Sequence, residues 1–443
     1  MTTRLTKSAK SLLDHVDLSR ASLRRVGTLV AHEGLMLEVE GFPQPLGSNA
    51  RIVTDGSHDV RGEVVGFRGH RSLILPFDSD APFAAGARVV SDGEGGIAAC
   101  GNALLGRVID AHGNPLDGRP PISSRYSWPL AGRKVNPLRR SRVTKAIDSG
   151  VRSINGLLTM GEGQRVAIIA GSGVGKSVLM GQMLAGVECD VIVVGLVGER
   201  SREVSDFVET KLTPGIRRKS VVVAVPADHP PLLRLRAAMR ATAIAEYFRN
   251  EGKRVFLLID SLTRVAHAQR EIGLSLGEPP TMKGYPPSAL SMIPRLVERA
   301  GIDSETGGSI TAVYTVLADG GDTDDPVVDS ARAIVDGHIV LSRTLAEQGL
   351  YPAIDIAKSL SRIMPDVTDD AHLLAARSFR RLWSVYEENR DLVLMGAFVP
   401  GNDAVLDEAI ARHDELQGYI GQGLRETIDF AASRAALIEG FGQ

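Results

Sequence analysis

The stretch Ala170-Gly-Ser-Gly-Val-Gly-Lys-Ser177 determines the fold expected for this chain, because of the segments on either side of it. Residues 165–170 are a short β-branched run typical of a buried strand, and residues 178–185 carry apolar side chains at helical spacing. A strand, a glycine-rich turn and a helix in this order predict a phosphate-binding loop. Ala170 stands where such loops commonly have glycine, so a glycine-rich surface turn is the alternative.

The chemistry of this loop follows from its backbone and from two side chains. Glycines let the backbone N–H groups turn inward toward a phosphate, and the following helix adds the positive end of its dipole. Lys176 would reach the β- and γ-phosphates of a nucleotide, and the Ser177 hydroxyl would hold Mg²⁺. The predicted nucleotide-binding residues are Gly171, Ser172, Gly173, Val174, Gly175, Lys176, Ser177 and Val178.

Composition and charge limit the classes of protein to which the chain can belong. Its 443 residues suggest about two or three domains, and its net charge of −2 gives no general attraction to nucleic acid or acidic membranes. Cys100 and Cys189 lie far apart without metal-ligand spacing, which favours a reducing compartment. No apolar run approaches the ~18–20 residues of a membrane span, and no secretory signal is expected.

The pattern of apolar residues predicts four segments along the chain. Residues 1–24 carry apolar positions at helical spacing beside a basic face, which fits either a frayed tail or an amphipathic docking helix. Residues 25–95 contain short strand-like runs separated by turn residues, which predicts a small β-barrel. Residues 96–364 begin with loops and then alternate strands and helices around a parallel sheet, and 365–443 form a helical C-terminal domain.

Individual strands and helices are predicted from the same periodicity. The barrel strands are expected at 26–30, 35–39, 60–67, 72–75 and 87–90. The strands of the parallel sheet are expected at 165–170, 191–197, 221–225, 255–260, 310–317 and 338–342. The C-terminal helices are expected at 369–394, 403–421 and 424–438.

Acidic residues follow two of the predicted parallel strands, at the sheet edge where ligands of such sheets bind. Glu199 follows 191–197 and could orient and deprotonate an attacking water; a first-turn helix glutamate is the alternative, and Glu203 is also near. Asp260 ends the apolar strand 255–260, as a Walker B acid does, and could hold Mg²⁺ through water. An N-cap role for Asp260 is the alternative.

A third group of polar residues lies in Tyr351-Pro-Ala-Ile-Asp-Ile-Ala-Lys-Ser-Leu-Ser-Arg362. Without further context this segment is a loop with an aromatic ring, a carboxylate and a guanidinium. Tyr351 beside a proline is more often a packing residue than a ligand, and Arg362 would ordinarily be a surface arginine.

In combination, these motifs resemble the rotary ATPase α/β-subunit superfamily, and most of all its flagellar and type III secretion export ATPases. The resemblance rests on 351–362, on Gly198-Glu-Arg200, on Asp260-Ser-Leu-Thr-Arg264 and on 170–177 with its leading alanine. It extends from about residue 25 to the C-terminus, with further matches at 105–110, 115–118, 269–273, 277–280, 284–287, 294–301 and 336–342. The implied fold is α/β, a RecA-like P-loop ATPase core with an N-terminal β-barrel and a C-terminal helical domain.

The resemblance implies catalytic and metal-binding roles at the matching positions. Lys176 and Ser177 would bind phosphates and Mg²⁺, and Asp260 would be the Walker B acid that also holds the metal. Glu199 would be the catalytic glutamate, accompanied by Arg200.

Two further residues gain roles from the same resemblance. Tyr351 would stack on the adenine of ATP, and Arg362 would be an arginine finger that reaches the neighbouring subunit's site. The chain departs from the family pattern at Ser201, usually glycine, and at Asp228-His-Pro-Pro231.

The implied activity is hydrolysis of ATP with Mg²⁺ to energise export of flagellar proteins, by a homo-hexamer whose sites are shared between subunits. A virulence-type (injectisome) ATPase is the alternative within the family. The implied partners are a stator-like regulator at 1–24, export gate components, and chaperones and substrates at the C-terminal domain. A cytoplasmic location, peripheral at the inner-membrane export apparatus, is expected.

Residues of this chain disfavour two functions from other classes. Non-catalytic nucleotide-binding subunits usually lack the acid of Gly-Glu-Arg, so Glu199 disfavours that function. A nucleic-acid translocase would require a basic, aromatic-rich barrel, whereas 25–95 has few aromatic residues and mixed charge, and no nucleic-acid partner is expected.

Overall fold

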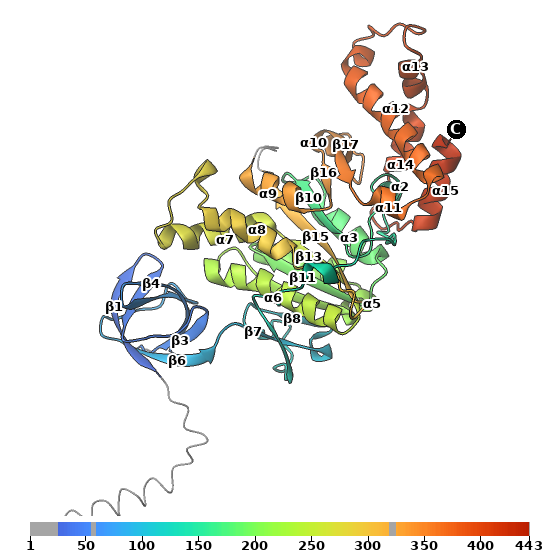
Figure 1. Ribbon diagram of the computed structural model, residues 1–443. Helices are drawn as coiled ribbons and strands as arrows, with labels where there is room; N and C mark the ends of the chain where they lie inside the picture. Colours follow the sequence, from blue (N-terminus) through green and yellow to red (C-terminus); the bar gives the residue numbers. More distant parts are fainter. Residues whose placement is uncertain (1–24, 55–58, 319–324, 443) are drawn as a thin grey trace, which may run out of the picture. The chain divides into compact units, whose positions relative to one another are not determined.

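The computed structural model describes residues 25–54, 59–318 and 325–442, and the chain divides between Gly96 and Ile97 into two compact units (Figure 1). The helix expected at 1–24 lies outside the described residues. No helix in the described part of the chain combines the length and the apolar composition needed to cross a bilayer.

The N-terminal unit is a closed antiparallel barrel, drawn in blue in Figure 1, with strand order β1-β2-β5-β4-β3-β6. Its strands are β1 (Val26–Glu33), β2 (Met36–Glu40), β3 (Ser48–Ile52), β4 (Val60–Arg68), β5 (Arg71–Pro76) and β6 (Arg88–Glu94). The predicted barrel is therefore confirmed, but β3 was missed. Its only apolar residues are Ala50 and Ile52, which face the barrel core, and this alternation is too weak to reveal a strand.

The second unit is built on a mostly parallel sheet with strand order β17-β16-β10-β15-β13-β11-β12-β8. Its strands are β8 (Arg107–Ile109), β10 (Arg165–Ala170), β11 (Val191–Val197), β12 (Ser220–Val225), β13 (Arg254–Asp260), β15 (Ser309–Leu317), β16 (Gly337–Leu341) and β17 (Ile354–Ser361). All six predicted strands are present with shifts of a residue at most. Their continuous β-branched runs are buried along almost their whole length, as expected when helices cover both faces.

Two pairings in this unit are antiparallel additions to the parallel core. β14 (Gly301–Ile302) pairs with β15, and β17 runs antiparallel to β16 at the sheet edge. A separate two-stranded sheet joins β7 (Ile97–Cys100) and β9 (Tyr126–Pro129).

Helices connect the strands, and the long α6 packs against β11, β12 and β13. The α-helices are α2 (Arg152–Leu157), α3 (Lys176–Gly186), α4 (Ser201–Asp206), α5 (Pro214–Arg218), α6 (Pro231–Asn250), α7 (Leu262–Ser275), α8 (Pro287–Val297), α9 (Pro326–Ile334), α10 (Arg343–Glu347) and α11 (Met364–Val367). Short turns of helix are η1 (Asn102–Leu104), η2 (Pro137–Arg139), η3 (Phe207–Lys211) and η4 (Met282–Gly284).

The C-terminal helices, drawn in orange to red in Figure 1, are α12 (Asp370–Leu394), α13 (Ala404–Ala411), α14 (His413–Ile420) and α15 (Phe430–Phe441). The helix predicted at 403–421 is divided into two at Arg412. The helix predicted from 424 begins only at Phe430, because residues before it are hydrogen-bonded to the sheet domain: Ile428 N–H donates to Gly150 O (3.1 Å), and Asn155 Nδ2 donates to Ile428 O (3.1 Å).

Candidate nucleotide-binding site

The loop between β10 and α3 has the backbone geometry that a phosphate-binding loop requires. Gly173 and Gly175 have φ angles of 79° and 90°, in the left-handed region that glycine adopts most easily. Gly175 is the N-cap of α3, and its carbonyl accepts the N–H of Leu179. Val174 is buried and anchors the loop, while Ser172 and Gly173 are exposed. The helix therefore begins at Lys176, with its free N–H groups facing the loop.

Lys176, Glu199 and Asp260 come together from three elements of the same sheet edge. The Nζ of Lys176 lies 2.6 Å from Asp260 Oδ1 and 3.4 Å from Glu199 Oε1. Strand β13, which ends in Asp260, lies between β11 and β15. From β15, the Thr315 hydroxyl donates to the same Oδ1 of Asp260 at 2.5 Å. The structure thus joins the lysine of the loop to both acids that were singled out in the sequence.

Burial and charge act in opposite directions within this cluster. Burial works against charge on Lys176, but the carboxylates of Asp260 and Glu199 outweigh it and raise the pKa of the ammonium. Burial also raises the pKa of Asp260, against the effects of Lys176 and Thr315. Two carboxylates beside one ammonium leave an excess of negative charge, which favours an additional cation at this position.

The residues present fit a magnesium ion that is shared with a nucleotide. Ser177, Glu199 and Asp260 line one cavity of about 380 Å³, and hydroxyl and carboxylate oxygens are the ligands that Mg²⁺ prefers. Within the described ranges, no group of three or more His, Cys, Asp and Glu side chains is arranged to hold a metal alone. Mg²⁺ commonly binds through one or two protein oxygens together with water and substrate phosphates.

Glu199 and Arg200 are neighbours in sequence but differ in environment. The N–H of Ala227 donates to the Glu199 carbonyl (3.1 Å), and the Glu199 side chain, 11% exposed, points to Lys176. The Arg200 side chain is 86% exposed and lies 3.8 Å from Glu203, although it lines the same cavity. The structure therefore places Glu199 at the cluster and leaves Arg200 at the rim of the cavity.

Tyr351 lies directly against the phosphate-binding loop. A Cβ placed on Gly175 would lie 3.2 Å from Cε1 of the Tyr351 ring, so ring and loop are in contact. The carbonyl of Tyr351 accepts the N–H of Gln422 at 2.8 Å, which joins the C-terminal segment to this side of the site. An aromatic ring beside the loop is available to stack on a base.

Arg362 lies at the other end of the sheet. In the β16–β17 pairing, Ile354 is opposite Leu341 and Ser361 is opposite Gly337, and Gly337 is in turn opposite Val166 near the start of β10. The phosphate-binding loop follows the other end of β10, roughly 13 Å away at ~3.3 Å per residue. Within one subunit, Tyr351 therefore lies beside the phosphate-binding loop, and Arg362 lies far from it.

Comparisons with known proteins identify the family. The nucleotide-binding domain of the ATP synthase alpha/beta family matches residues 150–361, and the T3SS EscN ATPase C-terminal domain matches residues 368–439. The flagellum-specific ATP synthase of Salmonella typhimurium is 50% identical over 99% of this chain and 98% of its own length. That of Pseudomonas aeruginosa is 50% identical over 93% of this chain and 92% of its own length. The chain belongs to the family of flagellar and type III secretion export ATPases.

A solved structure supports the same assignment at the level of the fold. The assembled ATPase EscN from the enteropathogenic E. coli type III secretion system superimposes with a TM-score of 0.88 at 38% identity, covering 93% of this chain and 99% of EscN. The predicted RecA-like core with its barrel and C-terminal helices is confirmed, and the chain is an ATPase that uses ATP. The roles of the individual site residues stay predictions.

Sequence reasoning missed two residues of this export ATPase's site. Thr315 is a polar residue inside the predicted strand 310–317, which is a usable signal, but its contact with Asp260 depends on β13 and β15 being neighbours. Gln422 had no signal in the sequence. Its Nε2 donates to Gly150 O (2.8 Å) while its backbone N–H donates to Tyr351, and neither contact is local.

Proposed function

We propose that this export ATPase energises the export of flagellar proteins through a type III secretion apparatus, as a homo-hexameric ring with nucleotide sites shared between subunits. The observation that carries the shared site is the position of Tyr351 and Arg362 at opposite ends of the sheet. Arg362 is exposed and remote from the phosphate-binding loop of its own chain. An Arg362 side chain can therefore reach a phosphate-binding loop only when a neighbouring subunit provides it. The flagellum-specific relatives support the flagellar over the injectisome function.

Within one subunit, the proposed roles follow from the charge cluster. Lys176 exchanges its contact with Asp260 for the β- and γ-phosphates of ATP, while Ser177 and Asp260 hold Mg²⁺. The ion, when bound, neutralises charge on the phosphates. Glu199, released from Lys176, orients the attacking water and accepts its proton, and Tyr351 stacks on the adenine.

Between subunits, Arg362 supplies the charge that the cluster lacks. It stabilises negative charge on the transferring phosphoryl group, a contribution of about 10³–10⁵ in rate for arginines supplied in trans. Hydrolysis then depends on ring assembly, and the assembled state of EscN supports self-association of this chain. Arg200, at the cavity rim, accompanies Glu199 in the same shared site.

The remaining segments are proposed to hold partners. Residues 1–24 bind a stator-like regulator and touch the membrane peripherally, and the C-terminal domain, 365–443, contacts chaperones and substrates. Export gate components are a further partner. The barrel at 25–95 and the ATPase domain at 96–364 complete this organisation. The protein acts in the cytoplasm, at the inner-membrane export apparatus.

Mixing two inactive variants tests the shared site. Rings of Lys176→Ala subunits and rings of Arg362→Ala subunits should each be inactive. In a 1:1 mixture, about a quarter of the interfaces pair an intact loop with an intact Arg362 from the neighbour, so ATP hydrolysis should reappear.

The matched control mixes Lys176→Ala with Glu199→Gln, both of which damage the loop side of the interface. Every site in that mixture carries one defect, so no recovery is expected. If the first mixture is as inactive as the control, although both variants form mixed rings, the shared site is wrong.

A further inference from the structure

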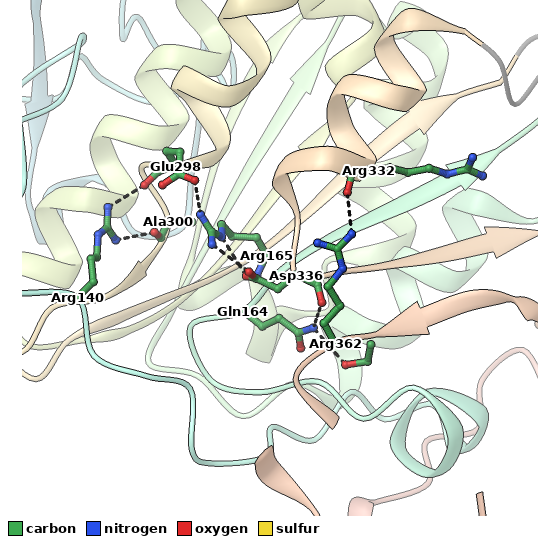
Figure 2. A network of polar contacts seen from close by, with 9 residues as sticks. Arg140, Gln164, Arg165, Glu298, Ala300, Arg332, Asp336 and Arg362 are labelled. Carbon is green, nitrogen blue, oxygen red and sulfur yellow. Dashed lines mark hydrogen bonds and ion pairs between the residues drawn. The ribbon is translucent and has the colours of Figure 1, made fainter. Parts of the chain in front are cut away.

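The backbone of Arg362 is held by Asp336, and Figure 2 shows the two residues beside each other. The N–H of Arg362 donates to the Asp336 carbonyl at 2.9 Å, immediately after β17 ends at Ser361. The Arg362 guanidinium has a weaker contact, with Nη2 3.5 Å from the carbonyl of Arg332 in the last turn of α9. The side chain of Arg362 is thus exposed and can extend, while its backbone is fastened at one point.

Asp336 is itself fixed by Arg165. Its carboxylate accepts from Nε and Nη2 of Arg165 at 2.9 Å each, and from the Arg165 backbone N–H at 3.0 Å. In return, the N–H of Asp336 donates to the Arg165 carbonyl at 2.9 Å. A bidentate guanidinium–carboxylate pair with two additional backbone hydrogen bonds leaves Asp336 little freedom to move. The remaining Nη1 of Arg165 donates to a second carboxylate, that of Glu298, at 2.8 Å.

Gln164, the residue before Arg165, holds the other side of the same strand end (Figure 2). It is fully buried, and its Oε1 accepts the N–H of Gly161 at 2.8 Å. Its Nε2 donates to Ser361 Oγ at 3.2 Å, and the Ser361 hydroxyl donates to the Thr159 carbonyl at 2.8 Å. Gln164, just before β10, therefore holds the last residue of β17, and Arg165, the first residue of β10, acts through Asp336 on the residue after it.

We propose that Asp336 is a positioning residue for Arg362, and that with Arg165 and Gln164 it sets the point from which Arg362 reaches the neighbouring subunit's nucleotide. This inference rests on the proposed trans role of Arg362. Strand β10 begins at Arg165 and ends at the phosphate-binding loop of the same subunit.

The variant Asp336→Asn tests this inference, because it keeps the carbonyl that holds Arg362 but removes the charge that holds Arg165. Displacements of about 1 Å from reacting atoms cost ~10²-fold in rate, so kcat of assembled rings should fall by about 10- to 100-fold. The KM for ATP and nucleotide binding by isolated subunits should change little, since the variant leaves the loop, Glu199 and Tyr351 in place. Loss of ATP binding together with turnover would instead indicate a general structural role.

Glu298→Gln is the matched control. It removes the other carboxylate partner of Arg165 and has no contact with Ser361 or Arg362, so kcat should stay within about twofold of the unaltered ring, as for an exposed ion pair. If Asp336→Asn fails to fold, Ser361→Ala provides the same test. It removes the hydroxyl that Gln164 holds, leaves the Arg165–Asp336 pair intact, and should also lower kcat without raising KM.

The double variant Asp336→Asn/Arg362→Ala separates this inference from the proposed function. If Asp336 acts through Arg362, the double variant should be no slower than Arg362→Ala alone. Multiplicative losses in the double variant would overturn the positioning role while leaving the trans arginine in place. Unchanged turnover in Arg362→Ala alone would overturn the proposed function and the positioning role together, which is a different result.

Discussion

The two ends of the central sheet carry charge in different ways. At the carboxyl end, the Lys176 ammonium lies 2.6 Å from Asp260 and 3.4 Å from Glu199, so each of these charged side chains has a partner of opposite sign nearby. At the opposite end, Arg362 is exposed, and within the described part of the chain its guanidinium donates only to a carbonyl at 3.5 Å. In the proposed shared site, the first end receives the nucleotide, and the second end offers a cation to the neighbouring subunit.

The largest effect should come from removing the cation at the far end. Arg362→Ala should lower hydrolysis by assembled rings by about 10³–10⁵, because the transition-state charge loses its counter-charge. ATP binding to isolated subunits, measured by titration calorimetry, should be unchanged, since Arg362 is distant from its own loop. Weaker ATP binding by the isolated Arg362→Ala subunit would show that Arg362 affects the nucleotide site of its own subunit.

The next largest effect should come from the carboxyl end. Glu199→Gln is isosteric and removes only the base, so kcat should fall by about 10²–10⁴ while ATP binding is retained. Single-turnover measurements after rapid mixing separate the chemical step from product release. Near-normal turnover would exclude Glu199 as the base and direct attention to Glu203, which lines the same cavity.

Gly175→Ala should have a smaller effect, on stability as well as on binding. Its φ of 90° costs a residue with a Cβ about 1–2 kcal/mol, and the new methyl group would lie 3.2 Å from Tyr351. Gly173→Ala has the same strain at φ 79° but meets nothing within 4 Å. Thermal unfolding of both variants therefore isolates the contact between loop and ring. Equal loss of stability in the two variants would mean that this contact contributes nothing.

The smallest effect should come from the ring itself. Tyr351→Ala should raise the KM for ATP by about 2- to 12-fold with little change in kcat, which corresponds to ~0.5–1.5 kcal/mol for an aromatic contact. Tyr351→Phe keeps the ring and should behave like the unaltered enzyme. If the Phe variant has as high a KM for ATP as the Ala variant, the Tyr351 hydroxyl rather than ring stacking is responsible for the contribution to ATP binding.

Local patterns in the sequence were sufficient to predict the strands and the acidic residues at the carboxyl end of the sheet. The strands 165–170 and 191–197 are found as β10 and β11 with unchanged bounds, because continuous β-branched runs have few alternatives to a buried strand. In a parallel sheet, all such strands release their next residue at the same edge, which is why Lys176, Glu199 and Asp260 could be expected to meet.

Local patterns failed where contacts distant in sequence decide the structure. The short β3 has only two apolar residues and is a strand because two neighbours complete the barrel. Residues 424–429 have helical periodicity, yet hydrogen bonds to Gly150 and Asn155 hold part of this segment in an irregular course. Thr315 and Gln422 reach the site through strand order and long-range hydrogen bonds, which periodicity does not encode.

The sequence alone determined that this chain has a phosphate-binding loop followed by two strand-end acids, because each of these features is specified within a few residues. Only the tertiary structure decided that Tyr351 and Arg362 lie at opposite ends of the sheet. Their separation depends on β17 running antiparallel to β16, and strand direction is set by how the whole chain packs at the sheet edge. The same packing places Asp336 and Gln164 beside Arg362, where they hold its backbone and its neighbour Ser361.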